Sequence, residues 1–156
     1  MSPKPEEILY VLAMQLLALR RFLRKNRGAE VQTFRNIEIL DLFLANFPIL
    51  MRHVALCIAE QRREDNSLAN FGLTIPYAWL PDVYLLCRRL ERIAEQIMAE
   101  YPEQAVPYLA NIKEKWRSLR VYVYCPATPN EKKYTELTSQ MYEQIELTEA
   151  RYRHED

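Results

Sequence analysis

Apolar residues recur at steps of three and four along most of this chain, which is the spacing of one face of an α-helix. Pro48 interrupts the pattern in its first half, and Gly28 ends the first apolar run. The pattern predicts helices over residues 6–26, about 30–47, 49–63, about 81–101 and about 130–152. The expected fold is therefore an all-α bundle of five or six helices, with residues 1–156 forming one domain and residues 64–80 a long packed loop.

The segment 107–125 carries two conflicting patterns. Leu109, Ile112, Trp116, Leu119 and Val123 follow helical steps of three and four, whereas the run 121–124 (Val-Tyr-Val-Tyr) has strand propensity. A turn at residues 117–118 would make this segment a β-hairpin. The five-position match favours a helix to residue 120 with an extended exit, and it places Trp116 in the core; a short hairpin within 112–125 is the alternative.

Composition limits the classes of function. The chain has 156 residues, the length of one domain, and 49% of them are hydrophobic. Only 2 are glycine, so neither a phosphate-binding P-loop nor a dinucleotide-binding fingerprint can be written. Lysine and arginine number 21, as do aspartate and glutamate, so no overall field draws the protein to nucleic acid or to an anionic membrane.

Three widely spaced cysteines, Cys57, Cys87 and Cys125, form no disulfide framework and favour a reducing compartment. The arginines follow the apolar run 8–19, whereas a secretory signal has its positive charge before the apolar stretch, and the run is too short to span a bilayer. We therefore expect a cytoplasmic protein without a membrane partner.

A resemblance to a known family lies in residues 112–122, Ile-Lys-Glu-Lys-Trp-Arg-Ser-Leu-Arg-Val-Tyr. This stretch resembles the Lys-Glu-Lys-Phe-Gly-x-Leu-Arg-Phe-Tyr signature of a family of small uncharacterised bacteriophage and prophage proteins. Residues 79–81 (Trp-Leu-Pro) and 86–87 (Leu-Cys) are also similar in order and spacing, so that the resemblance covers roughly residues 76–152. Trp116 replaces the signature's phenylalanine and Arg117 its glycine. The resemblance implies an origin in a phage or mobile element and implies no activity.

Candidate metal and catalytic chemistry is weak. His53, Cys57 and Glu60 share one helical face, but a structural zinc ion needs four ligands and the second histidine, His154, is distant in sequence. No nucleophile elbow is present, so we expect neither an enzyme nor a bound metal or cofactor.

The distribution of aromatic residues favours a protein partner. Nine of the 10 tyrosines lie from Tyr77 onward, and tyrosine with arginine is typical of interface anchors. We expect a non-enzymatic phage-type protein that binds a bacterial host protein or complex, for example as an inhibitor of a host system. The predicted anchors are Arg117, Arg120, Tyr122 and Tyr124.

A nucleic-acid-associated accessory factor is the alternative function. A basic cluster at one helix end could contact phosphates, although cations there also complement the helix dipole. A second patch near residue 117 combines cations with aromatic residues that could stack on bases. The first cluster is Arg20, Arg21, Arg24, Lys25 and Arg27, and the second is Lys113, Lys115, Trp116, Arg117, Arg120 and Tyr122. The broad apolar stripes of the first two helices further predict either a homodimer or a tightly packed central helix pair.

Overall fold

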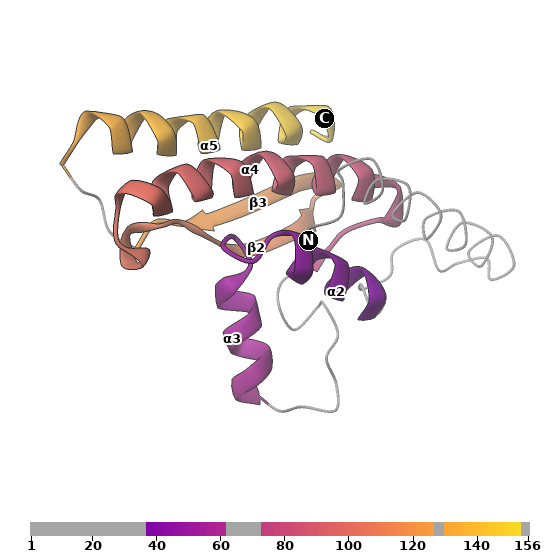
Figure 1. Ribbon diagram of the computed structural model, residues 1–156. Coiled ribbons are helices and arrows are strands. Elements are labelled where there is room, and N and C mark those ends of the chain that lie inside the picture. Colours follow the sequence, from indigo (N-terminus) through magenta and orange to yellow (C-terminus); the bar gives the residue numbers. More distant parts are fainter. Residues whose placement is uncertain (1–36, 62–72, 127–129, 154–156) are drawn as a thin grey trace, which may run out of the picture.

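A computed structural model describes residues 37–61, 73–126 and 130–153, and within them the fold is mixed rather than all-α. The helices are α2 (Ile37–Asn46), α3 (Arg52–Gln61), α4 (Leu80–Glu100) and α5 (Lys132–Arg151), with short 3-10 helices at Tyr77–Trp79 and Glu103–Ala105. The strands are β1 (Leu73–Thr74), β2 (Tyr108–Lys115) and β3 (Ser118–Tyr124). They form one sheet in the order β1-β2-β3, so the expectation of a five- or six-helix bundle is wrong (Figure 1).

The segment predicted as a helix over 107–120 is an antiparallel β-hairpin. β2 and β3 pair from Tyr108 with Tyr124 to Lys115 with Ser118, which leaves Trp116 and Arg117 as a two-residue turn. Both turn residues have positive φ, 55° and 63°, as a type I′ hairpin turn requires. The turn therefore comes one residue earlier than in the hairpin alternative.

A β-bulge explains why the hairpin imitates a helical pattern. The pairing register shifts between Leu109 and Asn111, so that Ala110 is an extra, exposed residue. Leu109 and Ile112 are consequently both buried although they are three residues apart, and a regular strand would bury residues two apart. A spacing of three is the signature of a helix, and the sequence pattern was therefore ambiguous.

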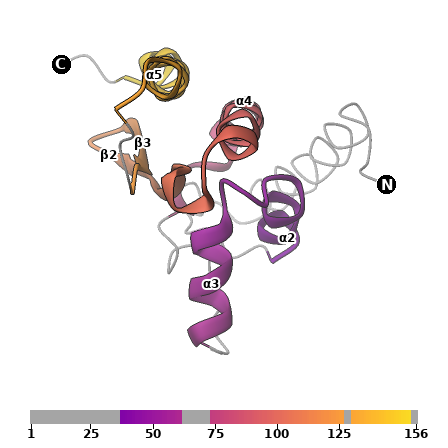
Figure 2. The ribbon, with the colours of Figure 1, turned by 60° about the vertical axis from the view of Figure 1, so that its left-hand side comes forward.

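The long helices α4 and α5 lie side by side over the inner face of the hairpin, while α3 projects to the opposite side (Figures 1 and 2). The helices predicted over 81–101 and 130–152 are confirmed as α4 and α5, and each buries residues at steps of three and four. The buried seam residues are Val83, Leu86, Leu90, Ile93 and Ile97 on α4 and Tyr134, Leu137, Met141, Ile145 and Thr148 on α5. They pack against Leu109, Ile112, Leu119 and Val121 of the sheet to form the core.

Both long edges of the hairpin are covered. On the β3 side, the Val121 N–H donates to Glu149 Oε2 (2.9 Å), and the Leu119 N–H donates to the Tyr152 carbonyl (3.3 Å). On the β2 side, β1 pairs in parallel with Ile112 and the residue after it, and the Leu109 N–H donates to the Leu50 carbonyl (2.9 Å). A partner would therefore contact the hairpin through the side chains of its outer face and not through main-chain pairing at a strand edge.

The second predicted helix ends at Asn46, just before Pro48, and the third begins at Arg52, as expected of a proline break. The turn between them is held by Glu91 of α4, whose two carboxylate oxygens accept from the N–H groups of Ile49 and Leu50 at 2.8 Å each. This carboxylate, 4% exposed, fixes where α3 starts relative to α4.

The helix predicted over residues 6–26 and the basic cluster of residues 20–27 lie outside the described residues, as do residues 30–36 of the second predicted helix. Among the helices of the described ranges, none combines the length and apolarity needed to cross a membrane.

Candidate binding surface on the hairpin

The outer face of the hairpin combines aromatic and cationic side chains. Residues paired across two antiparallel strands share a face, and the register of β2 and β3 therefore defines the members of this face. They are Tyr108, Asn111, Lys113, Lys115, Ser118, Arg120, Tyr122 and Tyr124, which we call the outer face. No carboxylate is among them, because Glu114 pairs with Leu119 and so belongs to the inner face.

Aromatic rings of the hairpin are open to solvent. Tyr122 is 43% exposed, Tyr124 is 52% exposed, and Trp116 in the turn is 83% exposed. The inner-face residues Leu119 and Ile112 are almost completely buried, and on the outer face Ser118 is buried as well, at 4% exposed. Exposed aromatic rings of this size are costly in water and mark surfaces that bind partners.

The tyrosines of the outer face lie at its end away from the turn, and the cations lie between them and the turn. The Lys113 ammonium lies 5.4 Å from the centroid of the Tyr122 ring, within the range of a cation–π contact. The rings of Tyr108 and Tyr124, opposite one another across the strands, are 5.3 Å apart. Lys115 and Arg120 stand between this aromatic pair and the turn. The surface can thus offer ring faces and positive charge to the same ligand.

The first turn of α3 closes one end of the outer face. The His53 ring stacks on the Tyr108 ring at 4.7 Å and 22°, and the Arg52 guanidinium carbon lies 5.1 Å from the Tyr108 centroid. Arg52 donates to the carbonyls of Ile49 (2.9 Å) and Pro107 (3.1 Å), and also to Val106. Burial lowers the pKa of Arg52, and the nearby Glu103 carboxylate opposes that effect. These contacts fix Tyr108 in place.

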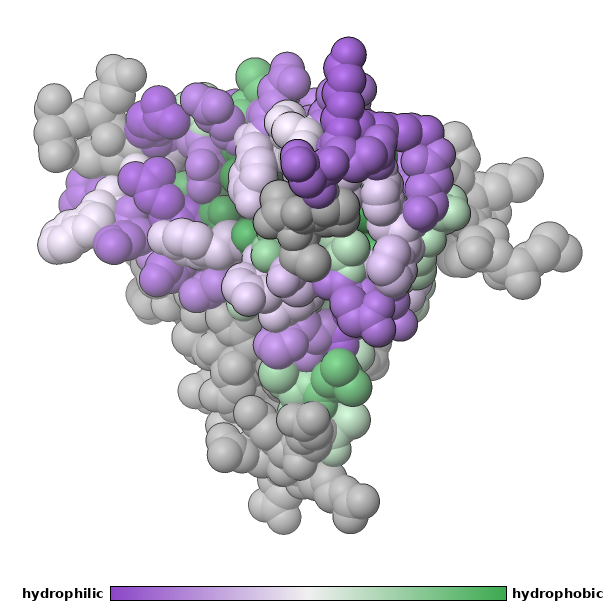
Figure 3. Space-filling view, turned by 90° about the vertical axis from the view of Figure 1, so that its left-hand side faces the viewer, coloured by the Kyte–Doolittle hydropathy of each residue, from purple (hydrophilic) through white to green (hydrophobic). Residues whose placement is uncertain are grey.

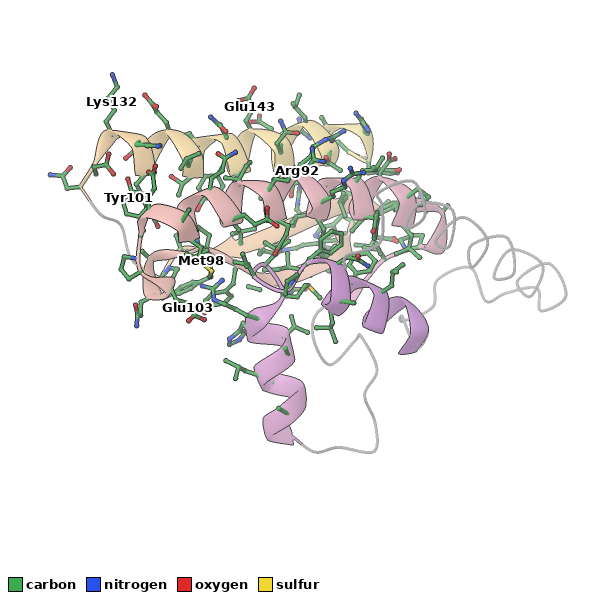
Figure 4. The ribbon with its side chains drawn as sticks, in the orientation of Figure 1. Arg92, Met98, Tyr101, Glu103, Lys132 and Glu143 are labelled. Atoms are coloured by element: carbon green, nitrogen blue, oxygen red, sulfur yellow. The ribbon has the colours of Figure 1, made fainter. Side chains whose placement is uncertain are left out.

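A cavity of about 420 Å³ adjoins this end. It is lined by Pro48, Arg52, His53, Ala55, Leu56, Glu103 and Tyr108, and Tyr108 thus belongs both to the cavity and to the outer face. Figure 4 shows Glu103 beside the first turn of α3. Seen from the side, hydrophilic residues cover most of the described upper surface, and a smaller hydrophobic area lies below them at the height of α3 (Figure 3).

The structure brings the predicted anchors together. Arg120, Tyr122 and Tyr124 lie on the outer face, and Arg117 lies in the turn at its end. Tyr108 was not among the predicted site residues, because only the strand register shows that it faces Tyr124. The expectation that Trp116 is a core residue is wrong, since the turn exposes it. The alternative cluster Arg20, Arg21, Arg24, Lys25 and Arg27 is outside the part of the chain that the structure describes.

No cluster of metal-ligating side chains is found in the described ranges. His53 Nε2 and Cys57 Sγ are 3.6 Å apart on α3, and no three histidine, cysteine or acidic residues among those described are grouped to hold a metal ion. The Cys87 thiol is completely buried, and burial raises its pKa well above the usual range, which keeps it protonated and inert. Burial likewise raises the pKa of Glu91, whose oxygens are already used on the backbone.

Comparison of the chain with protein-family models, with curated proteins and with solved structures gives no match.

Proposed function

We propose that this protein is a non-enzymatic binding protein whose outer face binds single-stranded nucleic acid. The observation that supports it is the composition of the outer face and its turn, with the cations Lys113, Lys115, Arg117 and Arg120 beside exposed tyrosines and no carboxylate. Proteins bind single strands by combining positive charge along the phosphates with aromatic rings on which bases stack. Sheet faces that carry exposed aromatic residues are a recurring platform for this purpose.

The dimensions of the surface fit a short strand. β2 has 8 residues, which at about 3.3 Å per residue gives a face roughly 25 Å long. Single-strand sites on small sheet domains range from about 4 to 16 nucleotides, and this face corresponds to the lower end. Tyr122 and Tyr124 provide the exposed ring surfaces. Because both strand edges are already hydrogen-bonded, a ligand would approach the hairpin from its outer face.

A bacterial host protein or complex is the second candidate partner. Exposed tryptophan, tyrosine and arginine are also typical of protein–protein anchors, and an acidic protein surface would complement the four cations. The sequence ranked this partner first because the net charge is zero and because the basic cluster of residues 20–27 is also explained by the dipole of a helix end. The exposed Trp116 and the local excess of positive charge reverse that order, and an inhibitory role in a phage-type setting belongs to this second candidate.

The test is fluorescence anisotropy with fluorescein-labelled dT and rU 12-mers. If four cations neutralise phosphates, the logarithm of the association constant should fall with the logarithm of salt concentration with a slope of about −0.7 × 4, or about −2.8. Raising the salt from 50 to 200 mM should then weaken binding roughly fiftyfold. The double variant Lys113→Ala/Lys115→Ala should reduce the slope to about half, and Tyr122→Ala/Tyr124→Ala should weaken binding at every salt concentration.

A matched control removes two exposed cations from elsewhere. Arg92→Ala/Lys132→Ala removes two positive charges from α4 and α5 (Figure 4), as many as Lys113→Ala/Lys115→Ala removes from the hairpin. It should leave the salt slope unchanged. An equal reduction of the salt slope in this control would contradict the proposal. So would the absence of binding of either 12-mer at micromolar protein concentration. Binding that survives in the hairpin variants but disappears in Arg20→Ala/Arg24→Ala/Arg27→Ala would move the site to the basic cluster.

A further inference from the structure

The turn of the hairpin uses two residues that are unfavourable for its backbone conformation. Trp116 and Arg117 both have φ in the left-handed region, at 55° and 63°. Type I′ turns strongly prefer Asn-Gly and similar pairs, because a Cβ atom crowds the backbone there and a bulky side chain is a true outlier. Arg117 takes this conformation at the position where the resembled phage signature has glycine.

Trp116 gains little from its own chain in return. Its side chain is 83% exposed, whereas the other tryptophan, Trp79, packs on the Tyr152 ring at 4.7 Å. An indole that is held in solvent by a strained turn neither stabilises the core nor improves the turn. Backbone strain of this kind persists where function uses it.

We infer that Trp116 is a stacking residue, which takes the base at one end of the strand bound along the outer face; this inference rests on the proposed function. The indole presents the largest ring surface of the hairpin. Lys115 and Arg117 flank it and can contact the phosphates on either side of the stacked base. The turn thereby adds a fourth ring beyond the row of tyrosines.

The chain contains 2 tryptophans, so fluorescence can observe Trp116 alone. In a Trp79→Phe variant, all indole emission comes from Trp116, and titration with unlabelled dT or rU 12-mers should quench it as a base stacks. In the matched Trp116→Phe variant, emission comes from Trp79 and should stay constant. Binding of the labelled 12-mers without any change in Trp116 emission would overturn this inference alone, and absence of binding would overturn it together with the proposed function.

A second experiment separates binding from stability. Replacing the turn by its preferred pair, Trp116→Asn/Arg117→Gly, should raise the Tm by about 3 °C or more because the strain is relieved. The same variant should bind the 12-mers about tenfold or more weakly than Arg117→Gly alone, which lacks the same charge, since stacking of a base on the indole is lost. Arg117→Gly alone should also raise the Tm while retaining the Trp116 signal. A variant that lacks the indole and binds as tightly as the natural protein would overturn the inference.

Discussion

Replacing Glu91 by leucine should lower the free energy of unfolding by about 2–4 kcal/mol at pH 5, because it leaves the buried N–H of Leu50 and the partly buried N–H of Ile49 without an acceptor. Each orphaned N–H costs about 1–3 kcal/mol, and part of this is offset because a carboxylate no longer has to be desolvated. Leu50 is completely buried, so water cannot replace the lost acceptor. Glu91→Gln keeps one carbonyl oxygen as an acceptor, so its free energy of unfolding should decrease less than that of the leucine variant.

The pH dependence of this loss has a definite sign. Burial raises the pKa of Glu91 in the folded protein above its usual value near 4.5, so the folded state holds this proton more tightly than the unfolded state. Stability from Glu91 is then fully present below pH 4.5 and decreases as pH rises through the raised pKa. The difference in stability between the natural protein and Glu91→Leu should therefore narrow as pH rises above about 4.5 and through the raised pKa.

Urea unfolding followed by circular dichroism measures this difference through the midpoint and the slope. An exposed carboxylate on the same helix, changed as Glu95→Leu, is the matched control and should shift the midpoint little. A Glu91→Leu variant as stable as the natural protein, or a difference that widens with rising pH, would refute the reasoning. Because the Leu50 carbonyl also accepts from Leu109, loss of Glu91 should disturb the end of the hairpin as well.

Two further predictions concern a thiol and a phenol. Iodoacetamide should alkylate the half-buried Cys57 and Cys125 of the folded protein and leave Cys87 unmodified until urea is added. Peptide mass spectrometry measures the labelling of each cysteine. Labelling of Cys87 at the same rate as the other two would contradict its burial. Tyr152→Phe should lower the free energy of unfolding by about 1 kcal/mol at pH 8, because the Tyr152 hydroxyl donates to Asp82. Tyr124→Phe should change the free energy of unfolding little. Burial and that hydrogen bond raise the pKa of Tyr152 to about 12. The contribution of the Tyr152 hydroxyl to folding stability is therefore complete below pH 10 and is lost as pH rises through about 12. A Tm for Tyr152→Phe equal to that of the natural protein would refute this contribution.

The sequence predicted the elements whose burial follows a single period. α4 and α5 keep one buried seam over about five turns each, and their helical assignment was correct. Pro48 likewise marked the break between α2 and α3 correctly. Local spacing is sufficient for such elements because each buries one continuous stripe.

The hairpin could not be predicted with the same reliability, because two irregular features changed its period. The bulge at Ala110 places Leu109 and Ile112 three residues apart, and the turn at Trp116 and Arg117 lacks the glycine that marks a hairpin. Tyrosines and valines at residues 121–124 were the signal that favoured strands. The predicted anchors Arg120, Tyr122 and Tyr124 were placed on one surface nonetheless, because alternation within β3 does not depend on the bulge.

The covered edges of the hairpin have a consequence for how any partner is recognised. Exposed strand edges let a sheet capture an extended peptide through main-chain pairing, and they also seed aggregation. Here the carboxylate of Glu149 and the carbonyl of Tyr152 occupy N–H groups of β3, and β1 with the Leu50 carbonyl occupies β2. Selectivity must therefore reside in replaceable side chains, so the ligand preference of this surface can change by point substitution while the backbone that presents it stays the same.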